Sequence, residues 1–310
     1  MIGAWTFPAG PVYLVGGIIH AGPVALAAIR RFPVSERLPL IYIAGSSFSG
    51  STLMDLLLGS HPGIESLGEA KKIAAVRSAD SGAPATCNCG DPVSSCAFWQ
   101  TVLPGNMAFR ADDPEANADL CRRALSFRGR QVVLDNSKNI GRALMLQRSG
   151  LFDLHVLHMV RDSRAVVFSH RRKAERRVHD HGYRLAPTAR EWERLNRRLA
   201  RAFRPRAGTG YLRVRYEDLV DRPEEEVRRV LREVSLPWDP QALKFREGRH
   251  HGIEGNRMRL DTKREIVRDD EYLAGLGCFE WCAITALTAR GLRDFGYRWS
   301  REPARPINSR

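Results

Sequence analysis

Apolar runs alternate with amphipathic helical patterns over most of this chain, and this alternation predicts an α/β protein. Residues 38–44 form a continuous apolar run, as expected of a parallel strand that is buried on both faces, and further strands are predicted at residues 131–134, 154–160 and 211–215. Helical spacing is found at residues 51–58, 164–177 and 223–234. Strands that alternate with helices form parallel sheets with helices on both faces, so we expect a three-layer αβα domain around a central parallel sheet.

The domain is predicted to cover residues 38–300, between an apolar extension at 1–37 and a tail at 301–310. The extension contains no Lys, Arg, Asp or Glu before Arg30 and Arg31. A stretch of about 20 apolar residues can span a membrane as a helix, although the prolines and glycines here weaken such a helix. Two alternatives therefore stand: membrane association through residues 1–31, or an apolar extension of the domain.

The same extension is relevant to the location of the protein in the cell. Two arginines directly after an apolar segment would keep the domain on the cytoplasmic side of a membrane. The positively charged start and the small-residue cleavage site of a secretory signal are missing. We predict a cytoplasmic protein, or one at the cytoplasmic face of a membrane.

The charge balance narrows the function classes only slightly. Hydrophobic residues make up 43% of the 310 residues and charged ones 27%, which excludes wholesale disorder. The net charge of +14 is compatible with binding to phosphate, sulfate, nucleic acid or an anionic membrane, but also with an arginine-rich composition. The chain has no nucleic-acid-binding motif, and acidic residues are interspersed with the basic ones at 223–234. We predict no nucleic-acid partner.

Three cysteines, Cys87, Cys89 and Cys96, lie in a Cys-, Pro- and Gly-containing excursion at residues 83–107. They could supply three thiolates to zinc, but no fourth ligand follows at a standard spacing. The adjacent pair His250–His251 has no cysteine partner nearby in sequence and is a weak candidate for a metal ligand. We therefore interpret the excursion as a surface loop and predict no metal site. Two further cysteines, 278 and 282, are predicted to lie in the core of an apolar helix.

The most informative motif is the glycine- and serine-rich segment from Gly45 to Thr52, with a predicted strand before it and a helix after it. Its spacing is that of a phosphate-binding loop, whose backbone N–H groups and helix dipole favour an anion. Nucleotide hydrolases carry Lys after the second glycine, where this chain has Ser51, and Asp135 is the only acidic candidate for magnesium at a strand end. The fold is therefore expected to resemble the phosphate-loop nucleotide hydrolases, with a phosphate-bearing donor that reacts without metal.

Two other predicted strand ends offer groups that bind anions. Arg161 follows the strand at 154–160, and Ser169 lies two helical turns later. Lys138 ends the polar segment after the strand at 131–134, which we predict to be a turn over residues 135–139. Taken singly, such residues are usually surface ion pairs or solvated cations. Because ligands of open α/β sheets bind at the carboxyl ends of the strands, three such ends together favour a phosphate site.

These motifs resemble those of the sulfotransferases that use 3′-phosphoadenosine-5′-phosphosulfate (PAPS), in particular the bacterial and Golgi-type branch that includes the tyrosylprotein sulfotransferases. The resemblance covers about residues 38–300 and is carried by the segments 49–69, 132–138, 158–169 and 214–220. It implies in-line transfer of a sulfonate group from PAPS to a hydroxyl or amine acceptor without a metal, with adenosine 3′,5′-bisphosphate as the product.

The resemblance also implies roles for single residues. The loop residues implied to hold the phosphosulfate are Ser47, Ser49, Gly50, Ser51 and Thr52. Those implied to lie at the nucleotide and its 3′-phosphate are Arg161, Ser169 and Tyr216. Glu69 resembles the general base and Lys138 the lysine that reaches the transferring sulfonate. Without the resemblance, Glu69 would be interpreted as an exposed carboxylate paired with Lys72. Arg257 or Arg259 could reach the 3′-phosphate, and a solvated basic loop is the alternative for both.

One departure from the family pattern concerns the phosphate loop. Many members carry Lys or Arg where this chain has Phe48. Lys138, or an arginine from elsewhere in the chain, must compensate for the missing cation, or turnover is slow. Two other functions remain alternatives: a degenerate phosphate-loop kinase or nucleotide hydrolase, and a non-catalytic binder of nucleotides or polyanions. The acceptor class stays open among glycan, lipid, peptide and small molecule. We expect residues 83–107 and 178–190 to frame its site.

Overall fold

A central parallel sheet organises the protein, as the sequence predicted. The computed structural model describes residues 37–77, 86–105, 109–176, 183–204, 210–253 and 265–303. Its strands are β1 (Leu38–Gly45), β2 (Ile64–Ser66), β3 (Val132–Lys138), β4 (Phe152–Val160) and β5 (Gly210–Arg215). They form one sheet in the order β2-β3-β1-β4-β5, and every neighbouring pair is parallel.

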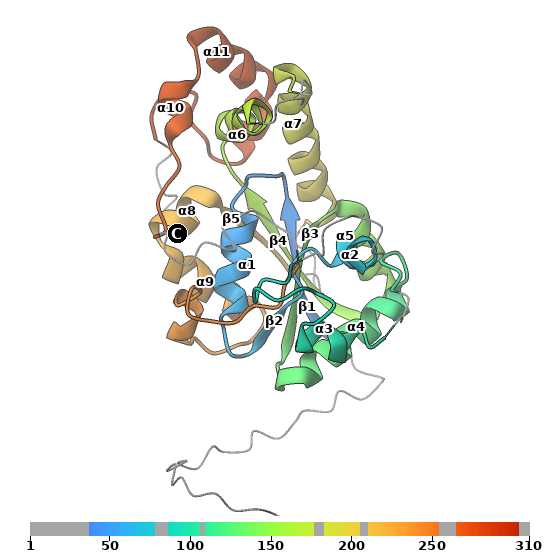
Figure 1. Cartoon of the computed structure of the whole chain (residues 1–310). Coiled ribbons are helices and arrows are strands. Elements are labelled where there is room, and N and C mark those ends of the chain that lie inside the picture. Colours follow the sequence, from blue (N-terminus) through green and yellow to red (C-terminus); the bar gives the residue numbers. More distant parts are fainter. Residues whose placement is uncertain are drawn as a thin grey trace, which may run out of the picture.

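Helices cover both faces of this sheet (Figure 1). On one face, Leu40 and Tyr42 pack with α3 (Ala97–Val102), α4 (Pro114–Arg128) and α5 (Ile140–Ser149). On the other face, Ile41 and Ile43 pack with α1 (Ser51–Gly59) and α9 (Pro223–Glu233). The shorter elements are η1 (Ala70–Lys72), α2 (Ile73–Arg77), α8 (Tyr216–Asp221), η2 (Pro240–Leu243) and α12 (Ala289–Asp294). The three-layer αβα prediction is confirmed.

A third group of helices lies beyond the carboxyl ends of the central strands (Figure 1). It consists of α6 (Ser163–Glu175), α7 (Leu185–Ala202), α10 (Glu271–Gly275) and α11 (Cys278–Leu287), which share a separate apolar cluster. This cluster is built around Phe168, Tyr272 and Trp281. It places α6 and α7 next to the sheet edge at which ligands of parallel α/β proteins bind.

The central strand β1 shows why its sequence is apolar without alternation. Ile41, Tyr42 and Ile43 are each 0% exposed, although successive side chains point to opposite faces. Full burial of one large apolar side chain contributes roughly 1.5–3 kcal/mol relative to exposure, so both faces of this strand stabilise the fold.

Three local predictions are wrong. Residues 135–138 continue β3 instead of turning, because Asp135 accepts hydrogen bonds from the backbone N–H and the hydroxyl of Ser137, and pairs with Arg142. The excursion around Cys87 and Cys96 is not a surface loop, since both side chains are buried in the core cluster of one sheet face. Cysteines 278 and 282 are exposed, because α11 buries Trp281 and Ile284 instead.

Several predictions concern segments outside the described residues. The apolar extension predicted at residues 1–37 lies outside the described residues up to residue 36, and its association with a membrane stays a prediction, as does the cytoplasmic location. Among the helices that the structure describes, none is both long and apolar enough to cross a membrane. Arg257 and Arg259 also lie outside the described residues.

A buried carboxyl on β2 gives a prediction about pH and stability. Burial raises the pKa of Glu65 to about 7, although Arg128 and Arg130 oppose the shift. Its Oε2 lies 3.7 Å from Nε of Arg130 and accepts no hydrogen bond from the described residues. The folded protein therefore binds this proton more tightly than the unfolded chain, so the contribution of Glu65 to stability is present below pH ~4.5 and is lost as the pH rises to ~7.

Glu65→Gln should therefore raise the free energy of unfolding at pH 8 by up to about 3 kcal/mol, and much less at pH 5. Urea unfolding at both pH values measures this difference. Glu233→Gln, at an exposed position of α9, is the control. A gain that is the same at both pH values would contradict the assignment of the effect to ionisation.

Candidate active site

The phosphate loop between β1 and α1 has a conformation that only glycine can adopt at two positions. A Cβ on Gly45 would lie 2.4 Å from the carbonyl oxygen of Met159. Gly50 has φ +85° and caps the N-terminus of α1, and a Cβ there would lie 2.7 Å from the ring of Tyr216. The hydroxyl of Ser49 donates to the carbonyl of Ser46 at 2.7 Å. The loop therefore delivers the N-terminal end of α1, where backbone N–H groups and the helix dipole favour an anion.

Arg161 joins this loop from the end of β4. Its Nη1 donates to the carbonyl of Phe48 at 3.2 Å, and its guanidinium lies 4.3 Å over the ring of Tyr216. Its Nε is buried and has no hydrogen-bond partner among the described residues. The structure thus brings together Arg161, Tyr216 and the phosphate loop, as predicted. Ser169 is buried one to two turns into α6, and its hydroxyl donates to the carbonyl of Ala165 at 2.9 Å.

Asp269 contacts both Arg161 and Tyr216 and so holds them in place. The sequence did not point to this residue. Its carboxylate pairs with Arg161 at 3.2 Å and with Arg172 at 2.8 Å. Its backbone N–H donates to the hydroxyl of Tyr216 at 3.0 Å. Burial tends to raise the pKa of Asp269, but the two arginines outweigh it and lower the pKa below the usual value. Asp269 follows no motif and is 108 residues from Arg161, so no sequence spacing could have pointed to it.

Phe48 occupies the position of the phosphate loop at which a Lys or Arg was expected, and it packs against residues of α6. Phe48 has φ 64° and packs edge-on against the ring of His170, with centroids 4.9 Å apart. The ammonium of Lys173 lies 5.9 Å from the centre of the Phe48 ring. Among the described residues, Lys173 on α6 and Arg161 at the end of β4 therefore bring positive charge close to this part of the loop, and neither belongs to the loop itself.

Glu69 and Lys138 form the second part of the site. Lys138 ends β3 with φ 62°, and its Nζ lies 2.6 Å from Oε1 of Glu69. The other carboxylate oxygen pairs with Lys72 at 3.0 Å. Glu69 is only 7% exposed, so the pair with Lys72 is present but the interpretation as an exposed carboxylate is wrong. Burial tends to raise the pKa of Glu69, but Lys138 and Lys72 outweigh it and lower the pKa, so the side chain is ionised at neutral pH.

A buried polar network connects the two parts. Asp55 of α1 accepts hydrogen bonds from the hydroxyl of Ser66 at 2.5 Å and from the amide of Asn136 at 3.3 Å. The same amide nitrogen lies 3.4 Å from the carbonyl of Ser51. Burial raises the pKa of Asp55 to about 6 despite these hydrogen bonds. The network fixes the first turn of α1 relative to the end of β3 that carries Lys138. This network was not predicted, because Asp55, Ser66 and Asn136 come from three separate segments and no local spacing connects them.

Comparison with known proteins identifies the family of this fold and site. The sulfotransferase family model matches residues 39–240, well over half of the chain. The chain belongs to the sulfotransferase family. A relative from Caenorhabditis briggsae, provisionally named a protein-tyrosine sulfotransferase, is 25% identical over 230 residues, which are 72% of this chain and 73% of that protein.

Two solved structures share the fold of this sulfotransferase. The sulfotransferase domain from the Synechococcus PCC 7002 olefin synthase has a TM-score of 0.52 and 20% identity, over 85% of this chain and 97% of that one. The sulfotransferase domain from the curacin biosynthetic pathway has a TM-score of 0.54 and 18% identity, over 85% and 99%. The protein is thus a sulfonate-transferring enzyme, and nothing found favours the hydrolase, kinase or non-catalytic alternatives.

The acidic side chain that could have held magnesium in a nucleotide hydrolase has a structural role in this sulfotransferase. Asp135 accepts from Nε of Arg142 at 2.9 Å and from the backbone N–H of Ser137 at 2.8 Å. Arg142 in turn donates to the side-chain oxygen of Asn117 at 2.6 Å. These contacts tie β3 to α5 and α4, and they engage both oxygens of Asp135.

A basic cavity of the sulfotransferase opens next to Lys138. Its volume is about 920 Å³. It is lined by the start of α5 and by one side of α7. The arginines of α7 in this lining are Arg194, Arg197, Arg198 and Arg201. Glu191 and Glu193 are the acidic residues of the lining. The described parts of the segments expected to frame an acceptor site, 86–105 and 183–190, do not line this cavity.

Proposed function

We propose that this sulfotransferase uses PAPS as its sulfonate donor and transfers the group to a hydroxyl or amine acceptor by in-line displacement. The observation that carries the proposal is the contact of Arg161 with both the phosphate loop and Tyr216. A phosphate loop binds one phosphate-containing group at the start of α1. A guanidinium beside it, with a buried N–H that lacks a partner among the described residues, suits a second phosphate, and PAPS differs from simpler nucleotides by its 3′-phosphate.

The proposed chemistry assigns one task each to Glu69 and Lys138. The acceptor loses a proton as it attacks sulfur, and the ionised carboxylate of Glu69 is suited to take that proton. Negative charge develops on the bridging oxygen that leaves with the nucleotide, and an ammonium group at this sheet edge stabilises it. Lys138 keeps two further N–H donors besides the one directed at Glu69, because an ammonium carries three.

The acceptor is proposed to enter through the cavity next to Lys138. The arginines of α7 outnumber the two glutamates in the lining, which favours an acceptor that carries negative charge. Glycan, lipid, peptide and small-molecule acceptors of this kind remain open. Opposite charge raises the rate of encounter more than it raises affinity, so acceptor turnover should fall with increasing salt.

Thermal unfolding in the presence of nucleotides tests the donor. Adenosine 3′,5′-bisphosphate should stabilise the protein by about 2.7 kcal/mol at about 100 times its dissociation constant. Adenosine 5′-monophosphate, which lacks the 3′-phosphate, and ATP with Mg²⁺ should raise Tm much less at the same concentration. If ATP with Mg²⁺ gives the larger shift, the proposed donor is wrong.

A further inference from the structure

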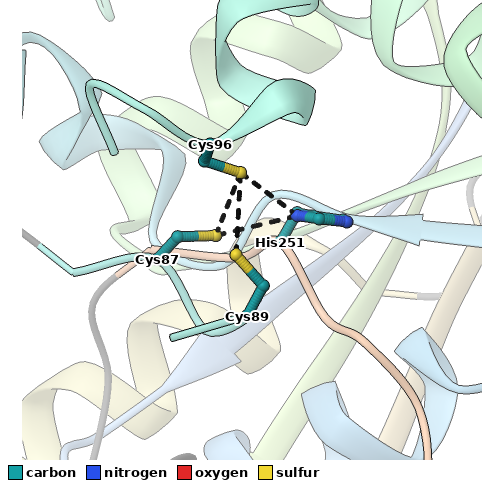
Figure 2. Close-up of side chains that lie close together, drawn as sticks. All are labelled: Cys87, Cys89, Cys96 and His251. Atoms are coloured by element: carbon teal, nitrogen blue, oxygen red, sulfur yellow. Dashed lines mark hydrogen bonds between the residues drawn. The ribbon is translucent and has the colours of Figure 1, made fainter. Parts of the chain in front are cut away.

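Four side chains with soft or borderline metal-ligating atoms point toward one another (Figure 2). Cys87 and Cys89 come from the excursion, Cys96 caps the start of α3, and His251 comes from the C-terminal part of the chain. Their ligand atoms all lie within 4.8 Å of one another. The interpretation that the histidine pair has no cysteine partner is therefore wrong. His251 supplies the fourth ligand group, 155 residues after Cys96 in sequence.

The separations match a tetrahedral zinc site. Zn–S bonds of about 2.3 Å and Zn–N bonds of about 2.0 Å place sulfurs roughly 3.8 Å apart, and sulfur and nitrogen roughly 3.5 Å apart. The Sγ atoms of Cys89 and Cys87 each lie 3.7 Å from Sγ of Cys96. Nδ1 of His251 lies 3.3 Å from Cys96 Sγ and 3.8 Å from Cys87 Sγ. The sulfur–sulfur distances are far longer than the ~2.05 Å of a disulfide.

We propose that Cys87, Cys89, Cys96 and His251 bind one Zn²⁺ ion as a structural site. Four protein ligands complete the coordination that zinc prefers, which distinguishes structural from catalytic zinc sites. Binding replaces the three thiol protons, which are released to solvent, so the bound site carries a net charge of −1. The prediction that the chain has no metal site is replaced by this proposal, which assigns no step of sulfonate transfer to the metal.

Two residues next to His251, Phe98 and Arg128, bear on its proposed role as a zinc ligand. Phe98 stacks on its ring, with centroids 5.0 Å apart and an interplanar angle of 14°. Nη2 of Arg128 lies 2.6 Å from Nε2 of His251, and Nη1 of Arg128 donates to the carbonyl of Arg249. Zinc on Nδ1 requires the ring proton on Nε2, so the contact between Arg128 and Nε2 would have to break on zinc binding, whereas the bond of Arg128 to Arg249 could stay. The positive charge of Arg128 then offsets the negative charge of the site.

The proposed zinc fastens the segment that positions Glu69. The backbone N–H of Glu69 donates to the carbonyl of Ile253 at 2.9 Å, and Gly68 and Cys87 each form a β-bridge with Ile253. The backbone N–H of Asn88 donates to the carbonyl of Gly252 at 3.0 Å. One ion would thus hold residues 87–96 and 251–253 together, directly behind the backbone of Glu69.

Metal analysis of the intact protein tests the site without depending on activity. We expect one zinc per chain after production in zinc-supplemented medium and dialysis, measured by mass spectrometry of the metal. Cobalt substitution should give the thiolate charge-transfer and visible bands of a tetrahedral site. Cys89→Ser, at a half-buried ligand position, should lose at least about 10-fold in zinc affinity, whereas Cys282→Ser, at an exposed position outside the cluster, should retain the metal.

Three outcomes would overturn the proposal. Wild-type protein that contains no zinc and shows no tetrahedral cobalt spectrum would exclude the site, and this measurement needs no variant. A mass two hydrogens lower, mapped to a bond between two of the three cysteines, would show a disulfide in its place. Equal zinc retention by Cys89→Ser and Cys282→Ser would place the metal elsewhere. None of these outcomes depends on which donor the enzyme uses.

Discussion

Glu69→Gln should lower the rate of sulfonate transfer by about 10³-fold while leaving the affinity for adenosine 3′,5′-bisphosphate nearly unchanged. The amide keeps the size and buried position of the side chain but cannot accept the acceptor proton. Incorporation of radiolabelled sulfate from PAPS into acceptors of one cell extract, used for every variant, measures the rate. Because the pKa of Glu69 is lowered, its contribution should be constant through neutral pH and decrease only in acid, below the usual range of a glutamate.

Two controls separate the loss of the base from the loss of its ion pairs. Lys72→Met breaks one pair of Glu69 but leaves the carboxylate and its contact with Lys138, so it should reduce transfer far less than Glu69→Gln. Glu233→Gln, at an exposed position on α9, should not change transfer. Full activity of Glu69→Gln would remove Glu69 from the role of base. Equal losses in Glu69→Gln and Lys72→Met would assign it a positioning role only.

Arg161→Met should weaken binding of adenosine 3′,5′-bisphosphate by about 100-fold, since a hydrogen bond to a charged group contributes roughly 1.5–3 kcal/mol. Adenosine 5′-monophosphate should lose much less, because it lacks the group that Arg161 is proposed to bind. Titration calorimetry with both nucleotides measures the difference. The comparison also controls for damage to the loop: Arg161 contacts Phe48 and Asp269, so a purely structural role would weaken both nucleotides equally. Arg232→Met, exposed on α9, should leave both affinities unchanged.

The fold was predictable where burial is uniform. β1 is apolar throughout because helices cover both faces of the sheet, and its pattern therefore identifies it as a parallel strand. β2 has only three residues and includes Glu65, so it carries too little apolar pattern to be recognised. β3 was predicted to end at residue 134, because a polar segment normally indicates a turn. It continues because Asp135 and Asn136 find buried partners that only the folded protein supplies.

The site was predictable where it follows a motif in sequence. The phosphate loop, Arg161 and Lys138 each follow a strand, and the parallel sheet places such strand ends at one edge. Asp269 and His251 could not be predicted in this way, because each meets its partners more than 50 residues away. Contacts of that range depend on tertiary packing, and no local spacing records them. The backbone N–H of Glu69 likewise donates to Ile253, which lies far from it in sequence.

The contacts of Ile253 and Asp269 have a consequence for the order in which this enzyme is completed. The five strands that the structure describes have all been synthesised once residue 215 is present, and the segment that matches the family ends at residue 240. The partners of the Glu69 backbone N–H and of the Arg161 side chain come later, at residues 253 and 269. A nascent chain, or a fragment trimmed to the family match, therefore contains every described strand but lacks these contacts in both parts of the candidate site. Competence for sulfonate transfer would arrive only with the last fifth of the polypeptide.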